Sequence, residues 1–142
     1  MAVRSSCAAG RLRRAAREMT QLYDEALAPS GLTVTQLPIL VALALYGPLP
    51  LKRLAEALGL DRTTLTRNLR VLEQPGLIVV ASDPADARVR LAELTDEGRD
   101  HLLSALERWR DVQGGILDEY GEPRLHALFG EISSLTETAG VG

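Results

Sequence analysis

The spacing of apolar residues along the chain predicts a mainly helical protein. Apolar side chains recur every three or four residues over residues 8–28, 51–58, 62–74, 95–117 and 122–138. This period is typical of α-helices that bury one face. The sequence has no internal repeats and no low-complexity segments, so we expect these helices to pack as one folded chain.

A further helix is predicted to end at Tyr46. Thr33 and Gln36 stand three residues apart, as in a capping box, which favours a helix start at Thr33. Pro38 lacks the amide that would bond to the carbonyl of Val34. We therefore expect this helix to start late or to bend.

Two of the predicted helices, 51–58 and 62–74, are joined by only three residues. The joint Gly59–Leu60–Asp61 has the length and composition of a helix-turn-helix. After Gly76, two β-prone runs flank the turn-forming segment SDPADAR, which predicts a β-hairpin. Residues 47–50 are expected to form a turn. The fold class is therefore mainly α with a small β-hairpin wing, a winged helix-turn-helix.

Helix 62–74 has two chemically different faces. Leu65, Leu69 and Leu72 form one apolar stripe, and Asp61 is placed to cap the helix N-terminus. The opposite face carries Thr63, Thr66, Arg67 and Arg70. Such a helix buries its leucines and offers guanidinium and hydroxyl groups to a partner. The alternative is a merely solvated face on an ordinary surface helix.

Composition and charge indicate a globular protein with an uneven charge distribution. The chain of 142 residues is long enough for one compact domain or two small subdomains. Its net charge of −3 hides a basic excess over residues 1–90 and a larger acidic excess over residues 91–142. Lys52 is the only lysine, and arginine suits phosphates and guanine edges better than lysine does. The acidic average therefore does not exclude nucleic-acid binding.

Several classes of function are excluded by missing features. No apolar run reaches the roughly 18 residues of a membrane span, and the N-terminus lacks the pattern of a signal peptide. The single cysteine excludes an intrachain disulfide, and no Cys/His cluster could hold zinc. We expect a cytoplasmic protein with no cofactor and no metal, and no membrane partner.

Three segments together resemble the MarR (multiple antibiotic resistance regulator) family of bacterial transcription factors. They are GLTVTQLPIL, LAEALGLDRTTLTRNLRVLEQPGLI and DPADARVRLAELTDEG, in the order and at the spacing of the family. The third segment carries the family's Asp-x-Arg and Leu-Thr-x-x-Gly, here Asp86, Arg88, Leu94, Thr95 and Gly98. The resemblance covers nearly the whole chain, whereas a helix-turn-helix alone would be weak evidence.

The resemblance implies a homodimer that represses transcription from an inverted repeat in double-stranded DNA. Residues 31–94 would form the winged DNA-binding domain, and residues 1–30 and 95–142 the helical dimerisation region. Two apolar stripes would then need a partner surface, one at Leu102, Leu106 and Trp109 and one at Leu125, Phe129 and Ile132. Two winged lobes about one DNA turn apart would suit an inverted repeat.

The resemblance places the DNA contacts on helix 62–74 and on the wing. The candidates are Arg62, Thr63, Thr64, Thr66, Arg67, Asn68, Arg70, Asp86, Arg88 and Arg90. Arg67 is the first candidate for a base contact, because a bidentate arginine–guanine pair is the commonest specific contact. Arg88 is expected to enter a minor groove, oriented by Asp86. Arg90 is a weaker candidate, for a phosphate.

Cys7 is the candidate redox sensor, because the N-terminus is similar to the redox-sensing branch of the family. Cys7 matches the first cysteine of a Cys-x-Cys pair found in some relatives, and Ala9 stands at the second. The single-cysteine relatives align their reactive thiol with Ala9. Tyr23 matches a tyrosine that contacts that thiol, but a second such tyrosine is replaced near Val34. The alternative is a thiol without a role.

One other signal and two other functions stay open. Many family members bind small phenolic or lipophilic ligands, and Arg17, Tyr23 and Tyr46 are the candidates for an effector pocket. A thiol-based enzyme such as a peroxidase could use Cys7, although no paired histidine or acid stands near it. A winged helix used only for protein contacts is disfavoured by the arginine-rich helix. His101 and His126 are isolated and are expected at a surface or an interface.

Overall fold

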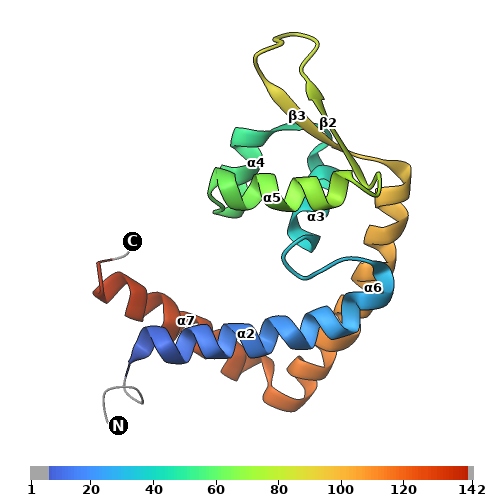
Figure 1. The fold of residues 1–142 in the computed structure, drawn as a ribbon. Helices are drawn as coiled ribbons and strands as arrows, with labels where there is room; N and C mark the ends of the chain where they lie inside the picture. Colours follow the sequence, from blue (N-terminus) through green and yellow to red (C-terminus); the bar gives the residue numbers. More distant parts are fainter. Residues whose placement is uncertain (1–6, 141–142) are drawn as a thin grey trace. The chain divides into compact units, whose positions relative to one another are not determined.

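The computed structural model describes residues 7–140, so the first six and last two residues of the predicted dimerisation region lie outside the described residues. The chain divides into two compact units, Met1–Arg108 and Trp109–Gly142. The elements in chain order are α2 (Ala8–Leu27), the 3₁₀ turn η1 (Ala28–Ser30), α3 (Leu37–Tyr46), β1 (Leu49–Pro50), α4 (Leu51–Leu58), α5 (Arg62–Glu73), β2 (Ile78–Ser82), β3 (Arg90–Leu94), α6 (Asp96–Tyr120) and α7 (Glu122–Thr138) (Figure 1).

The predicted helices are all present, and α3 starts late as expected. Pro38 lies in the first turn of α3, where its missing N–H leaves no hydrogen bond unmade. The Thr33 amide donates to the Gln36 side-chain oxygen at 3.0 Å, which is one half of the expected capping box. Residues 33–36 form a turn instead of helix, because the proline moves the first helical residue to Leu37.

The hairpin is part of a three-stranded antiparallel sheet with the order β1-β3-β2. Strand β2 pairs with β3 from Ile78 opposite Leu94 to Ser82 opposite Arg90. The expectation of a simple turn over residues 47–50 is wrong for the last two of them. Leu49 pairs with Ala92 and Pro50 with Leu91, so β1 forms one edge of the sheet.

The core of the first unit lies between the helix-turn-helix and the sheet. The predicted leucine stripe of α5 is buried, with exposed fractions of 2% at Leu65, 3% at Leu69 and 1% at Leu72. Buried apolar side chains from α3, α4 and the sheet complete this core; they are Ile39, Leu40, Leu43, Leu54, Ile78 and Ala92. Burial of these leucines fixes which face of α5 remains outside.

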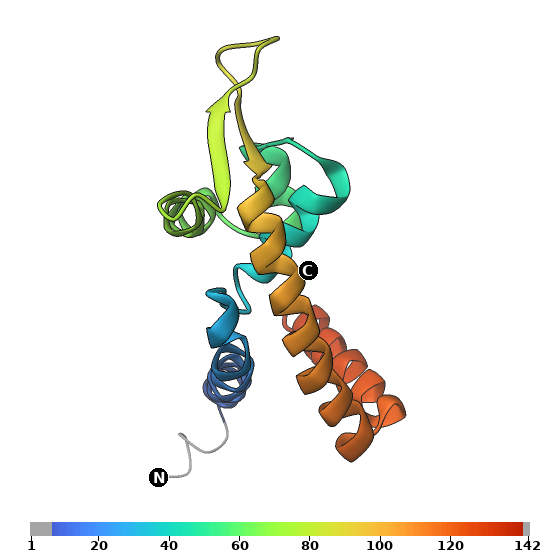
Figure 2. The same cartoon turned by 90° about the vertical axis from the view of Figure 1, so that its right-hand side faces the viewer.

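The start of α6 is fastened to the segment between α5 and β2. The Thr95 hydroxyl lies 2.6 Å from the Gly76 carbonyl oxygen and 3.0 Å from that of Leu77, and it accepts the Gly98 amide at 3.0 Å. The Thr95 amide donates to the Leu77 carbonyl at 3.1 Å. A Cβ atom on Gly98 would overlap the Leu77 carbonyl oxygen. Glycine is therefore required at position 98. Helix α6 begins at the base of the hairpin (Figure 2).

Apolar side chains in the second unit lack cover within the described chain. Helix α7 has no buried residue, and Phe129 is 57% exposed. In the first unit, the expectation that Leu102 needs a partner surface is wrong, because this residue of α6 is already buried in its own chain. Of the predicted α7 stripe, Leu125 and Ile132 are only partly buried. No described helix is both long and apolar enough to cross a membrane.

Replacing Gly98 with alanine should destabilise the fold by roughly 1–3 kcal/mol, because the new methyl group must displace backbone at Leu77. Thermal or urea unfolding of the purified protein measures this loss. Gly115→Ala is the control in the same helix, since a Cβ there meets no atom of the chain within 4 Å. The control should unfold at the wild-type temperature or above it, because alanine favours helix. Equal stability of Gly98→Ala and wild type would contradict the close approach.

Candidate nucleic-acid interface

The N-terminus of α5 is held by the predicted cap. Asp61 Oδ1 accepts the Thr64 backbone amide at 2.7 Å, and Asp61 Oδ2 accepts the Thr64 hydroxyl at 3.0 Å. The bond from the backbone amide is the largest of the causes that lower the pKa of Asp61. The carboxylate thus caps the start of the helix, and its negative charge interacts favourably with the helix dipole at the N-terminus.

The outer face of α5 presents basic and hydroxyl side chains in one shallow hollow. The hollow has a volume of about 520 Å³ and is lined by Arg62, Thr63, Thr66, Arg67, Arg70 and Val71. All six side chains are exposed. Within the described chain, none of the three arginines forms an ion pair. This face therefore offers uncompensated positive charge to an anionic partner.

Two predicted contacts on α5 are engaged within the helix. Thr64 is half-buried and its hydroxyl bonds to Asp61. Asn68 is half-buried, and its amide nitrogen donates to the Thr64 carbonyl at 3.0 Å. The structure thus gathers Thr63 and Arg67 on the open face and leaves Thr64 and Asn68 on its flank. Their contact with DNA stays a prediction.

Val71 belongs to this face and was missed from the sequence. It is 54% exposed and lines the hollow beside Arg67 and Arg70. Its spacing of four residues from Arg67 could have revealed it, because residues four apart share a helix face. An exposed valine in a basic groove can contact apolar groups such as a thymine methyl.

A second, smaller hollow joins α5 to the sheet. Its volume is about 240 Å³, and its lining residues are Leu51, Thr66, Leu69, Arg70, Glu73, Val80 and Arg90. It brings Arg70 of the helix and Arg90 of β3 to one groove, which the sequence did not predict. Two guanidinium groups in one groove can hold a phosphate, although Glu73 lowers the positive potential there.

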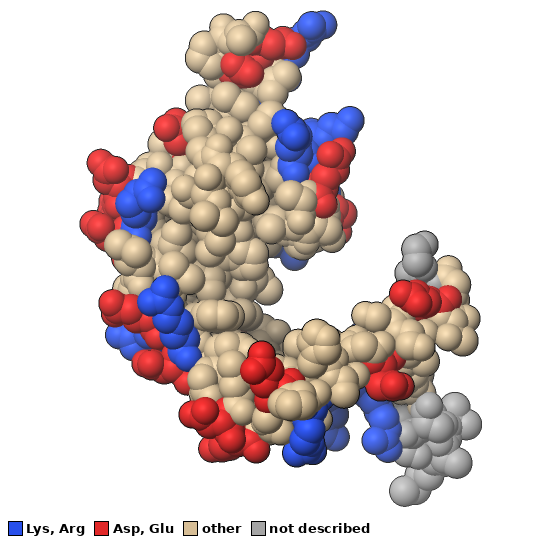
Figure 3. Space-filling view, turned by 180° about the vertical axis from the view of Figure 1, so that it is seen from behind, with Lys and Arg blue, Asp and Glu red and all other residues tan. Residues whose placement is uncertain are grey.

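The tip of the hairpin carries the predicted arginine–aspartate pair. Arg88 Nε lies 3.2 Å from Asp86 Oδ1, and the same oxygen accepts the Arg88 amide at 3.1 Å. The Arg88 side chain is 91% exposed. Acidic and basic side chains lie together at this tip in the view from behind (Figure 3). An exposed pair of this kind is weak, so the guanidinium can exchange the carboxylate for a DNA acceptor.

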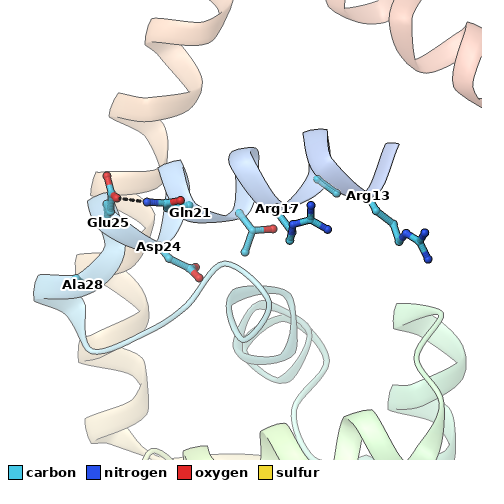
Figure 4. Close-up of a pocket in the computed structure, with 8 residues that line it drawn as sticks. Arg13, Arg17, Gln21, Asp24, Glu25 and Ala28 are labelled. Carbon is cyan, nitrogen blue, oxygen red and sulfur yellow. Dashed lines mark hydrogen bonds between the residues drawn. The ribbon is translucent and has the colours of Figure 1, made fainter. Parts of the chain in front are cut away.

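The predicted effector residues are not brought together around one hollow. A shallow hollow of about 890 Å³ runs along α2, with Arg13 and Arg17 toward one end and Asp24 and Glu25 toward the other (Figure 4). Neither Tyr23 nor Tyr46 lines it. Tyr23 is partly buried, which raises its pKa. Tyr46, at the end of α3, is 74% exposed. The three-residue pocket stays a prediction.

Cys7 stands at the N-terminal cap of α2. Its thiol is free and exposed, and its carbonyl accepts the Arg11 amide at 3.1 Å. His101 is half-buried, and the sequence did not predict its partner: Nδ1 lies 2.7 Å from the Ser30 carbonyl oxygen. The described residues contain no group of three or more His, Cys, Asp or Glu that could hold a metal.

Comparison with known proteins assigns the fold and the family. The family model described as MarR family matches residues 30–89. A crystal structure of the M. tuberculosis transcriptional regulator MosR in complex with DNA is 41% identical, with a TM-score of 0.79, and the match covers 94% of this chain and 98% of that one. The chain belongs to the MarR family of transcriptional regulators.

Two curated relatives extend this result. The organic hydroperoxide resistance transcriptional regulator of Bacillus subtilis is 38% identical over 101 residues, which are 71% of this chain and 66% of that protein. The transcriptional repressor NicR of Pseudomonas putida is 30% identical, over 91% of this chain and 84% of that protein. The family and these relatives are transcriptional regulators, so the alternative of a thiol-based enzyme is not supported.

Arg67→Ala should weaken specific DNA binding by roughly 1–3 kcal/mol and relax the preference at one base position per half-site. Arg88→Ala should weaken binding with a smaller effect on the major-groove preference. Fluorescence anisotropy measures both effects, with a DNA site that the purified protein retains from genomic fragments and with single-base variants of that site. Arg14→Ala is the control, because that arginine pairs with Glu18 on α2. Unchanged affinity in both test variants would mean that another face binds DNA.

Proposed function

We propose that this MarR-family regulator is a homodimeric repressor that binds an inverted repeat in double-stranded DNA. Helix α5 enters the major groove, with Arg67 reading a base, and the hairpin tip with Arg88 reaches the adjacent minor groove. Residues 31–94 form the DNA-binding domain, and residues 1–30 and 95–142 form the dimerisation region. The protein acts in the cytoplasm, where its DNA lies.

The outer face of α5 is the observation that carries this proposal. Its arginines and threonines line one hollow, and they stand opposite a leucine stripe that is buried to 97% or more. Bidentate donors on an exposed helix match the pattern of acceptors in the major groove. Arg70 and Arg90 share the neighbouring groove and supply a phosphate contact. The similar MosR protein has been crystallised with DNA, which supports the same mode of binding.

Homodimerisation is supported by the apolar side chains of α7. Leu128, Phe129 and Leu135 are 42%, 57% and 45% exposed, and the helix buries none of its residues. Most of the stability of a helix in water comes from packing of its apolar face, and this helix of 17 residues packs only in part within its own chain, which favours a partner surface that covers it. A second copy of the chain supplies that surface and places two recognition helices for an inverted repeat.

Release from DNA has two candidate signals. One is a small phenolic or lipophilic ligand bound near Arg17, Tyr23 or Tyr46. The other is oxidation of the exposed Cys7, and the similar Bacillus protein is named for organic hydroperoxide resistance. The thiolate would attack the peroxide oxygen, giving a sulfenic acid and releasing an alcohol. A second thiol would then displace water from the sulfenic acid and form a disulfide.

The decisive experiment sequences the DNA fragments that the purified protein retains from sheared genomic DNA. The expected result is a single inverted repeat that is retained without oxidant and released with it. Retention that is independent of sequence would contradict a repressor of specific genes. Retained fragments that are not released by hydroperoxide would favour the ligand as the signal.

Sedimentation equilibrium should give a dimer at micromolar concentration, because the exposed apolar side chains of α7 need cover. Phe129→Glu should shift the equilibrium toward monomer, since it places a charge in that surface. Glu131→Gln is the control on the same helix, at an exposed position. A stable, folded monomer of the wild type would contradict the dimer.

Cys7→Ser should remain bound to the operator in hydroperoxide that releases the wild type. Serine keeps the size of the side chain but cannot form a sulfenic acid or a disulfide. A gel-shift titration with an organic hydroperoxide compares the two proteins. Because the chain has one cysteine, mass spectrometry should locate all of the oxidised thiol at Cys7, separate from any sulfoxide formed at the two methionines. Equal release of both proteins, or of neither, would make Cys7 a bystander.

A further inference from the structure

The segment from the last residue of α2 to the first turn before α3, residues 27–36, alternates buried and exposed residues and is closed by hydrogen bonds. Leu27 is fully buried, and Leu32 and Ser30 are 2% and 3% exposed. The Ser30 hydroxyl donates to the Leu27 carbonyl at 2.6 Å and accepts the Leu32 amide at 3.3 Å. This connection, called the α2–α3 junction below, is therefore held in one conformation and is not a flexible linker.

The α2–α3 junction is also bonded to the helix before it. Asp24 Oδ1, on the last turn of α2, accepts the Val34 amide at 2.7 Å across ten residues. The junction itself is closed by the bond from the Thr33 amide to Gln36. A displacement of the C-terminal end of α2 must therefore carry the junction with it.

His101 joins this junction to α6. Its Nδ1 atom lies 2.7 Å from the Ser30 carbonyl oxygen, which is 71 residues away in the sequence. A carbonyl oxygen only accepts hydrogen bonds, so Nδ1 carries the proton and donates it. Gly31, with φ of 76°, lets the ring approach, because a Cβ atom there would stand 3.2 Å from Nδ1. The contact thus depends on the donor at position 101 and on the glycine opposite.

One turn earlier, the same helix holds the segment that follows α5. Gly98 lies against the Leu77 carbonyl, and the Thr95 hydroxyl bonds to Gly76 and Leu77. Gly98, Leu102 and Ala105 form the buried stripe of α6, and His101 lies beside that stripe. The first two turns of α6 therefore contact the segment that follows α5, the proposed recognition helix, at one point and the α2–α3 junction at another.

We propose that these two turns couple the α2–α3 junction to the recognition helix, and that His101 is the positioning residue that completes the coupling. The inference rests on the proposed function, because α2 belongs to the proposed dimerisation region and α5 to the DNA-binding domain. With His101 in place, the position of α2 in the dimer sets the spacing between the two recognition helices. Without its bond, the junction moves independently of α6, and that spacing is no longer fixed.

The test compares His101→Leu and His101→Asn with the wild type. Leucine fills similar space without a donor. The asparagine amide nitrogen is as many bonds from Cα as Nδ1 and keeps the donor. Asp100→Asn, at the exposed neighbouring position, is the control. Each protein is titrated with the selected inverted repeat, with the same repeat carrying one extra central base pair, and with a single half-site.

The leucine variant should bind the native repeat roughly three- to tenfold more weakly, the range of one hydrogen bond. It should bind the half-site like the wild type, and it should lose less affinity than the wild type when the extra base pair is inserted. His101→Asn should restore the wild-type spacing dependence. A merely unstable fold would lower all three affinities together. The same spacing dependence in the leucine variant and the wild type would overturn the proposal, as would a loss shared equally by leucine and asparagine.

Hydrogen exchange of the DNA-free protein tests the coupling independently of the proposed function. The amides of Leu32 and Val34 should exchange faster in His101→Leu and at the wild-type rate in His101→Asn. Unchanged exchange in the leucine variant would overturn the coupling. A wild type that binds no specific DNA would contradict the proposed function, while the exchange rates would still decide whether His101 holds the junction.

Discussion

The contact of the α6 backbone with the carbonyl of Leu77 is the constraint on which the rest of the DNA-binding unit depends. It can form only because residue 98 has no side chain, and it brings the Thr95 hydroxyl to the carbonyls of Gly76 and Leu77. Leu77 lies between the end of α5 and the first residue of β2. This contact therefore joins α5, the wing and α6 at one place. It also gives a physical explanation for the Leu-Thr-x-x-Gly motif.

The chemistry of α5 follows from the same packing. Because its leucines occupy the core, the opposite face is exposed to solvent. The residues on that face determine which partner α5 can bind. Asp61 interacts electrostatically with Arg67, but its oxygens bond to Thr64 and form no ion pair with an arginine. The helix is thus capped by its acidic residue and presents guanidinium groups without ion-pair partners in the described chain. The residues that pack the helix into the core and those on its exposed face, where DNA binding is proposed, are therefore different.

The sequence predicted what is periodic or local and missed what depends on distant partners. Helices with an apolar face, the cap at Asp61 and the pair at Arg88 all arise from residues a few positions apart. Strand β1 has only two residues and shows no alternation, so nothing in its own sequence indicated the pairing with β3. His101 was missed for a similar reason. A lone histidine on a helix has no pattern, and its acceptor is a backbone carbonyl far along the chain. The effector pocket stays a prediction, since neither tyrosine lines the hollow that contains Arg17.

Strand β1 limits the pairing of a further strand at its edge of the sheet. It is two residues long, it lies at one edge, and its second residue is Pro50, which has no N–H to offer. An incoming strand would find almost no ladder of donors and acceptors there, so this edge resists the sideways growth that leads exposed sheets to aggregate. At the other end of the ladder, we expect insertions in the loop between β2 and β3 to lengthen the wing without disturbing its packed base. In the proposed complex with DNA, the reach of the wing would then change separately from the stability of the fold.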